Sequence, residues 1–258
     1  MVLPDARRGV SGLFPEIQDS LPWSTGKPWC PAAGAGSGLP WKARQGIRLR
    51  IFNDRIRSGA AMSFDESLAY GKVGESIISR YMQSRGHAVL PVYEIEKGHG
   101  KGPQLFSIGK WLIAPDMLVF TASGAMFIEA KHKSVFTWHR ASSAWTTGID
   151  LRHYGDYLRV AKETRLPVWL AFYHRESIPS ESDRAHGCPS ECPTGLYVGE
   201  LFDLLTTENH RSKNFDPTRE GFVGHGKSGM VYWAESTLKK IASKEKVESA
   251  ISRERIAA

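Results

Sequence analysis

Two continuous apolar runs separated by a short turn constrain the fold of this chain more than any other feature. The first run is Met117–Phe120 and the second is Met126–Ile128. The five residues between them, 121–125, have the small and polar composition that is typical of turns. Runs that lack polar alternation are typical of strands buried on both faces. The sequence therefore predicts a β-hairpin in the interior of a domain.

Charged residues stand at the ends of these two predicted strands. Asp116 precedes the first run and Glu129 follows the second, so a hairpin centred near 122–123 places them opposite each other. Opposed residues have Cβ atoms roughly 4.5–5.5 Å apart. Because side chains alternate along a strand, Lys131 shares the face of Glu129 and Ala130 points away. Buried charges are costly without a partner, which favours a divalent cation here over an ordinary surface charge pair.

This arrangement resembles the signature of the PD-(D/E)xK nuclease superfamily, which includes Holliday-junction-resolvase and RecB-type nucleases. Pro115–Asp116 and the tripeptide Glu129-Ala130-Lys131 occupy the motif positions. Before them, residues 70–82 have apolar side chains at helical spacing, and Glu75 stands where that superfamily carries a helix glutamate. The resemblance covers roughly residues 64–205. It implies an α/β fold of the restriction-endonuclease-like type, a mixed central sheet flanked by helices.

The same resemblance implies a metal-dependent nuclease that hydrolyses DNA phosphodiester bonds. It assigns catalysis to Glu75, Asp116, Glu129 and Lys131, and metal binding to Asp116, Glu129, the backbone carbonyl of Ala130, and Glu75. Mg²⁺ suits such oxygen ligands, and Mn²⁺ can substitute for it. A homodimer is a further option, since many relatives act as dimers. The alternative is a catalytically silent DNA-binding or assembly protein on the same fold.

Four other residues near the motif are candidates for contact with nucleic acid. His153 and Tyr157 are four apart on a predicted helix over 149–163, where RecB-type nucleases carry a Gln-x-x-x-Tyr motif, and the glutamine is a histidine here. They are expected to contact phosphate or the active site, or else to pack at the helix surface. Lys133 shares the face of Lys131. Arg140 lies among aromatic residues that could stack on nucleotides or pack beneath a loop.

Positive charge is concentrated before the predicted nuclease domain. The chain has a formal net charge of +7, and residues 1–62 hold nine Lys or Arg against four Asp or Glu. We interpret 1–62 as an irregular basic arm rich in Pro, Gly and Trp, and 63–258 as the nuclease domain with a C-terminal strand and helix. A cluster of arginines in this arm is expected either to contact DNA phosphates or to be a solvated tail: Arg48, Arg50, Arg55 and Arg57.

Other classes of function find less support in the sequence. No apolar run approaches the ~20 residues that span a bilayer, so we expect a cytoplasmic protein of a bacterium or its virus without a membrane partner. Gly221–Ser228 fits the Walker A pattern but lacks a preceding strand and a following helix, so we expect no NTP binding. Cys188 and Cys192, with His186 nearby, could hold zinc, although two free thiols are favoured.

The remaining elements are predicted from periodicity and turn residues. Between the hairpin and the helix over 149–163 we expect a long irregular connection. Beyond that helix we expect a buried strand, a polar loop, a short strand, a helical turn, a late strand and a charged helix: 167–173, 175–193, 195–199, 201–205, 230–233 and 238–252.

Overall fold

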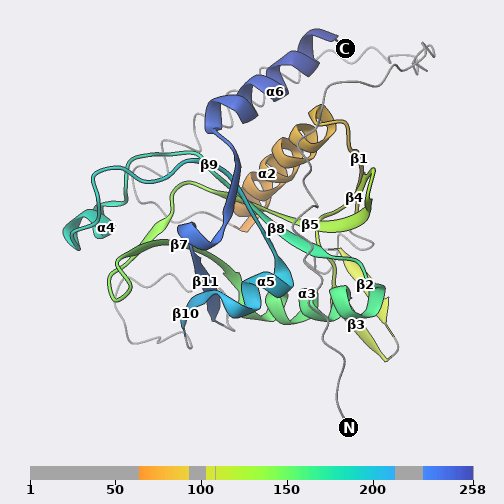
Figure 1. Cartoon of the computed structure of the whole chain (residues 1–258), viewed down its shortest axis with the longest axis horizontal. Helices are drawn as coiled ribbons and strands as arrows, with labels where there is room; N and C mark the ends of the chain where they lie inside the picture. The colour runs from red at the N-terminus through yellow and green to blue at the C-terminus, as the bar shows by residue number, and fades with distance from the viewer. Residues whose placement is uncertain (1–63, 93–102, 108, 213–228, 258) are drawn as a thin grey trace. The chain divides into compact units, whose positions relative to one another are not determined.

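The computed structural model describes residues 64–92, 103–107, 109–212 and 229–257 (Figure 1). The predicted N-terminal arm, with Arg48, Arg50, Arg55 and Arg57, lies outside the described residues, as does the Walker-like segment 221–228. The expectations for the arm therefore remain predictions.

A six-stranded mixed sheet forms the centre of the domain. Its strands, in spatial order, are β1 (Ala88–Pro91), β4 (Met117–Thr121), β5 (Gly124–Lys133), β8 (Val168–His174), β9 (Gly195–Glu200) and β12 (Lys239–Ala242). Neighbouring strands are antiparallel except for β5 and β8, which are parallel. This mixed sheet, flanked by helices, confirms the predicted α/β fold class.

The hairpin of β4 and β5 has the predicted register. Met117 pairs with Ile128 and Thr121 pairs with Gly124, the glycine having a φ of 139° that other residues rarely adopt. Residues 126–130 of β5 are all buried, as the continuous apolar run indicates. Val119 at the centre of β4 is also fully buried. Burial on both faces is therefore confirmed for β5, whereas in β4 it fails at Phe120, which is 44% exposed near the turn.

The connection from β5 to β8 contains more structure than the sequence predicts. Residues 134–148, expected to be irregular, include an antiparallel hairpin of β6 (Thr137–His139) and β7 (Ala144–Asp150), so that expectation is wrong. β7 pairs on its other side with β11 (Met230–Ala234). A strand stabilised by a partner some 80 residues away has no local sequence signal, which explains the miss. Helix α3 (Leu151–Thr164) completes the crossover.

Two smaller sheets accompany the central one. The four-stranded sheet has the order β10-β11-β7-β6, and its edge strand β10 (Glu208–Ser212) was not predicted. The two-stranded sheet consists of β2 (Gln104–Ser107) and β3 (Lys110–Ile113), which precede the central hairpin in sequence. Three short helical segments connect later strands: α4 (Glu181–Ala185), α5 (Leu201–Thr206) and η2 (Glu235–Thr237).

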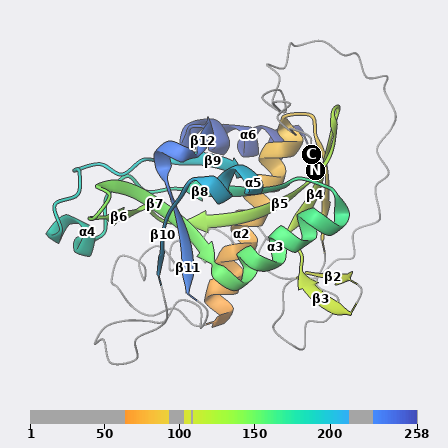
Figure 2. The ribbon, with the colours of Figure 1, turned by 60° about the horizontal axis from the view of Figure 1, so that its bottom comes forward.

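Helices cover both faces of the central sheet (Figure 2). On one face lie α2 (Phe64–Ser84) and α6 (Lys244–Ala257), where Tyr70 of α2 stacks on His132 of β5. On the other face α3 packs with the four-stranded sheet over a core that includes Phe127, Phe172 and Trp233. None of the described helices is long and apolar enough to cross a membrane.

The predicted C-terminal helix is wrong at its start. Residues 239–242 form strand β12, which pairs with β9 at the edge of the central sheet, and α6 begins only at Lys244. Lys239 and Lys240 are exposed on this edge strand. Charged side chains are common on edge strands, and the local composition alone is equally typical of a charged helix.

Candidate active site

Asp116 and Glu129 meet at the end of the central hairpin. Asp116 directly precedes β4, so the register of Met117 with Ile128 continues to place it opposite Glu129. Its Oδ2 accepts a hydrogen bond of 2.8 Å from the backbone N–H of Ala130. Its own carbonyl accepts another, of 2.9 Å, from the N–H of Val92. The hairpin and the strand beside it therefore hold Asp116 in position.

The Glu129 carboxylate is buried, with only 2% of the residue exposed. Its Oε1 forms an ion pair with Nζ of Lys131, which lies on the same face of β5. Its Oε2 is buried and has no hydrogen-bond partner among the described residues. An unsatisfied charged oxygen in this setting costs about 1–3 kcal/mol or more. Oε2 is therefore available to a cation.

The charges of the site act strongly on one another. Burial and the neighbouring carboxylate of Glu129 raise the pKa of Asp116 well above its usual range, while Lys131 acts in the opposite sense. Burial alone would lower the pKa of Lys131, but the carboxylates of Glu129 and Asp116 outweigh it and raise that pKa. The lysine therefore remains protonated, and two carboxylates share one cation. A divalent metal ion would relieve the repulsion that remains.

Glu75 lies within electrostatic reach of the carboxylates. It is half-buried on α2, and its charge contributes to raising the pKa values of both Asp116 and Lys131. Its Oε2 is 3.1 Å from Nζ of Lys72. Lys72 was not among the predicted site residues, although its spacing of three positions from Glu75 on a helix is a recognisable signal.

Helix α3 brings His153 and Tyr157 against the same cluster. Tyr157 is 1% exposed, and burial together with the carboxylates of Glu129 and Asp116 raises the pKa of its phenol. Burial and the charge of Lys131 lower the pKa of His153, whose ring centroid is 6.0 Å from that of Tyr157. The N-terminus of α3 is capped by Asp150, which accepts a 2.8 Å hydrogen bond from the N–H of Arg152. Both side chains thus face the candidate active site, and Tyr157 does so from the interior.

Lys133 and Arg140 occupy different surroundings. Lys133 is half-buried on the face of Lys131, and burial together with the charge of Lys131 lowers its pKa to about 8. Arg140 is exposed in the β6–β7 turn, where its carbonyl accepts a hydrogen bond from the N–H of Ser143. It lines a separate cavity beside α4. Lys133 thus lies within electrostatic reach of Lys131, and no described contact joins Arg140 to the carboxylates.

The possible metal ligands at the hairpin are oxygen atoms. In the part of the chain that the structure describes, no three His, Cys, Asp or Glu side chains gather as a metal cluster. Cys188 and Cys192 are free thiols, and the Cys192 thiol points to the carbonyl of Phe136 at 3.9 Å. A zinc site at these cysteines thus finds no support among the described residues. Two carboxylates and a backbone carbonyl remain the available oxygen ligands at the hairpin.

The flanks of the Walker-like segment are described, although the segment itself is not. Ser212 at the end of β10 pairs with Met230 at the start of β11, so the intervening chain connects two adjacent antiparallel strands. A phosphate-binding loop of the Walker type requires a helix directly after it. Strand β11 stands in that place.

Solved structures that are similar to this chain include two nucleases. One is Hjc of Archaeoglobus fulgidus, a Holliday junction resolvase, with 10% identity, a TM-score of 0.37, and coverage of 70% of this chain and 99% of that one. The other is D212, a nuclease from a fusselovirus, with 11% identity, a TM-score of 0.30, and coverage of 74% and 93% respectively. No protein-family model and no curated protein matches the chain.

Proposed function

We propose that this chain is a metal-dependent nuclease that hydrolyses DNA phosphodiester bonds at Asp116, Glu129 and Lys131. The observation that carries this proposal is the buried Oε2 of Glu129, which lacks a hydrogen-bond partner among the described residues and lies beside a second carboxylate. The ion pair with Lys131 engages Oε1 and leaves Oε2 open. A site built to receive a cation leaves one oxygen open.

The residues present fit Mg²⁺, with Mn²⁺ as a substitute. Asp116, Glu129 and the carbonyl of Ala130 would hold the ion, and Glu75 would hold a second ion or a water molecule. Hard divalent cations prefer such oxygen ligands. When bound, the metal supplies Lewis-acid polarisation of the phosphate and makes a water molecule a better nucleophile.

The chain's own side chains account for the rest of the chemistry. Lys131, held protonated by two carboxylates, would orient the attacking water and offset charge that develops on the phosphate. Tyr157 would fix the position of the Glu129 carboxylate from the interior, and His153 would face the substrate beside it. Lys133 would meet a neighbouring phosphate along the same strand. The presence of Asp, Glu and Lys together opposes the alternative of a silent DNA-binding or assembly protein.

The test is direct. Purified protein is incubated with single-stranded, duplex and branched DNA in EDTA, and then with Mg²⁺ or Mn²⁺ added. We expect no cleavage in EDTA and cleavage of at least one substrate with either ion. Cleavage that persists in EDTA would refute the metal-dependent mechanism. DNA binding without cleavage under every condition would support the silent alternative.

The basic N-terminal region is proposed to add affinity for DNA. Replacing its four arginines, Arg48, Arg50, Arg55 and Arg57, with alanine should flatten the dependence of log K on log salt, by roughly one unit for each phosphate that is no longer bound. Deletion of residues 1–45 retains these arginines, so it should weaken binding with little change in slope. If neither change alters affinity, the region does not contact DNA. Sedimentation of the full chain would test the proposed homodimer.

A further inference from the structure

A cavity of about 680 Å³ lies between the β6–β7 hairpin and helix α4. It is lined from the hairpin by Trp138, His139 and Arg140, and from α4 and its end by Ser182, Asp183 and His186. The two sides are separated by some 40 residues in sequence. They come from the connection over 134–148 and the polar loop over 175–193, neither of which was predicted to contain regular structure. Cavities of 300–1,000 Å³ are the size that holds small ligands. This one is large enough for one nucleotide unit.

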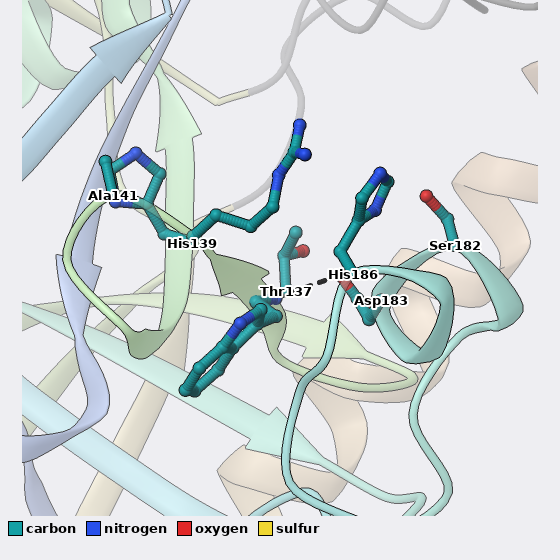
Figure 3. A pocket seen from close by; sticks show the side chains of 8 residues that line it. Thr137, His139, Ala141, Ser182, Asp183 and His186 are labelled. Carbon is teal, nitrogen blue, oxygen red and sulfur yellow. Dashed lines mark hydrogen bonds between the residues drawn. The ribbon is translucent and has the colours of Figure 1, made fainter.

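The single acidic residue that lines the cavity is engaged in holding its walls together. Asp183 is 7% exposed, and its Oδ1 accepts a 3.1 Å hydrogen bond from the N–H of Trp138, drawn as a dashed line in Figure 3. Its Oδ2 accepts a hydrogen bond of 2.6 Å from the hydroxyl of Ser180. Both carboxylate oxygens therefore have donors within the protein. The acid joins α4 to the hairpin, and both of its oxygens are already occupied by neutral donors, so a ligand's hydrogen bonds fall to the other lining groups.

The groups that remain for a ligand are a cation, a histidine and a hydroxyl. Arg140 is exposed and makes no ion pair with any described side chain. His186 and Ser182 are also exposed, and Figure 3 shows them side by side above α4. A guanidinium with neighbouring donors is a frequent arrangement for binding phosphate. A cationic or neutral ligand would leave the arginine without a partner.

The hairpin side of the cavity is preorganised. The ring of His139 stacks on that of His210 with centroids 3.8 Å apart and planes 8° from parallel. Its Nδ1 is 2.7 Å from the hydroxyl of Ser142, which itself donates to Oδ1 of Asn209. Trp138 is held edge-on against Trp145 with centroids 5.1 Å apart. Arg140 therefore directly follows Trp138 and His139, whose rings are held in place by these contacts. Fixed lining groups lower the entropy cost of ligand binding.

We propose that this cavity binds a backbone phosphate of a DNA strand, away from the bond that is cleaved. Arg140 pairs with the phosphate, Ser182 and His186 donate hydrogen bonds to it, and Trp138 provides apolar surface for the adjoining sugar or base. The choice of DNA as the ligand rests on the proposed nuclease function. The cavity itself shares no lining residue with the candidate active site.

The experiment measures binding separately from cleavage. A fluorescein-labelled DNA substrate is titrated with the full chain in EDTA, and anisotropy is followed at several salt concentrations. Arg140→Ala should raise the dissociation constant about 5–10-fold and reduce the salt slope by roughly one unit. Ser182→Ala and His186→Ala should weaken binding by smaller factors. Arg184→Ala is the matched control, because Arg184 is an exposed arginine of α4 that does not line the cavity.

Each outcome has a distinct meaning. Equal effects of Arg140→Ala and Arg184→Ala would overturn the proposal, whether or not the wild type cleaves DNA. Displacement of labelled DNA by micromolar inorganic phosphate or thymidine monophosphate, abolished in Arg140→Ala, would assign the cavity to a free phosphate compound and overturn the strand assignment. Absence of DNA binding by the wild type would overturn the proposed function together with this inference. Circular dichroism of each variant verifies that it is folded.

Discussion

The carboxylate of Asp116 accepts a 2.8 Å hydrogen bond from the backbone N–H of Ala130, the residue that follows Glu129. This bond crosses from one strand of the central hairpin to the other at the point where the apolar pairing ends. One carboxylate is thereby fixed next to the other by backbone geometry. Burial, and after it the repulsion between the two carboxylates, raises the pKa of Asp116.

Neutral replacements of the two carboxylates should abolish cleavage without unfolding the protein. Asp116→Asn and Glu129→Gln keep shape and remove charge, so we expect at least a 100-fold loss of rate, since even residues outside the ligand shell cost ~10–100-fold. Wild type should show a higher thermal midpoint when Mg²⁺ is added, and neither variant should. In EDTA Asp116→Asn should be no less stable than the wild type, because like charges no longer repel, whereas Glu129→Gln also loses the ion pair with Lys131.

The control for that experiment is Glu163→Gln, which neutralises an exposed acid on α3 outside the site. It should cleave and bind metal as the wild type does. Normal cleavage by both hairpin variants would reject the site assignment.

Removal of the lysine should affect both rate and stability. Lys131→Met should lower the cleavage rate by roughly 10²–10³-fold, the range typical of removing one group that stabilises charge developing in the transition state. It should also destabilise the metal-free protein by about 1–3 kcal/mol, because Glu129 then keeps a buried charge without its partner. The double variant Lys131→Met with Glu129→Gln should recover part of that stability in urea unfolding. A double variant that is less stable by the sum of both single effects would contradict the pairing.

Two glycines on α2 should respond in opposite directions to alanine. A Cβ at Gly74 would overlap the side chain of His132 on β5, so Gly74→Ala should destabilise the protein by about 1–3 kcal/mol. A Cβ at Gly71 meets nothing within 4 Å, so Gly71→Ala should stabilise the helix by up to ~1 kcal/mol. Urea unfolding of the pair measures the difference. Equal effects at both positions would disprove the close packing of α2 on β5.

Buried His174 should make the protein less stable in mild acid. Burial and the charge of Lys133 lower its pKa well below 6.5, so the unfolded chain binds a proton that the folded protein does not. The contribution is complete above pH ~6.5 and declines as the pH falls toward the folded-state pKa, by about 1.4 kcal/mol per pH unit. Unfolding free energies at pH 7.5, 6.0 and 5.0 test this.

His174→Phe should flatten that dependence, since the ring stacks on Phe136 at 3.6 Å and phenylalanine retains the contact. His186→Gln, at an exposed position, should leave it unchanged. Identical pH dependence in His174→Phe and wild type would exclude His174 as its source.

The sequence by itself determined the central hairpin and the order of groups along it. Its apolar runs are continuous and its turn is short, so pairing of nearby residues sets the register without help from the rest of the chain. Alternation along β5 then places Lys131 on the face of Glu129, a matter of strand geometry alone. The helix over 149–163 was also predictable from nearby residues alone, because its apolar spacing and its capping residue Asp150 both lie within that range.

Tertiary structure decided what pairs across long separations. β7 is a strand because it pairs with β11. Residues 239–242 are a strand because they pair with β9 at the edge of the central sheet. The cavity between Arg140 and His186 is formed by α4 and the β6–β7 hairpin together, which Asp183 joins across some 40 residues of sequence. The open oxygen of Glu129 likewise depends on burial by elements from several parts of the chain. Such pairings are stabilised by contacts between segments that are distant in sequence. Local sequence patterns therefore do not predict them.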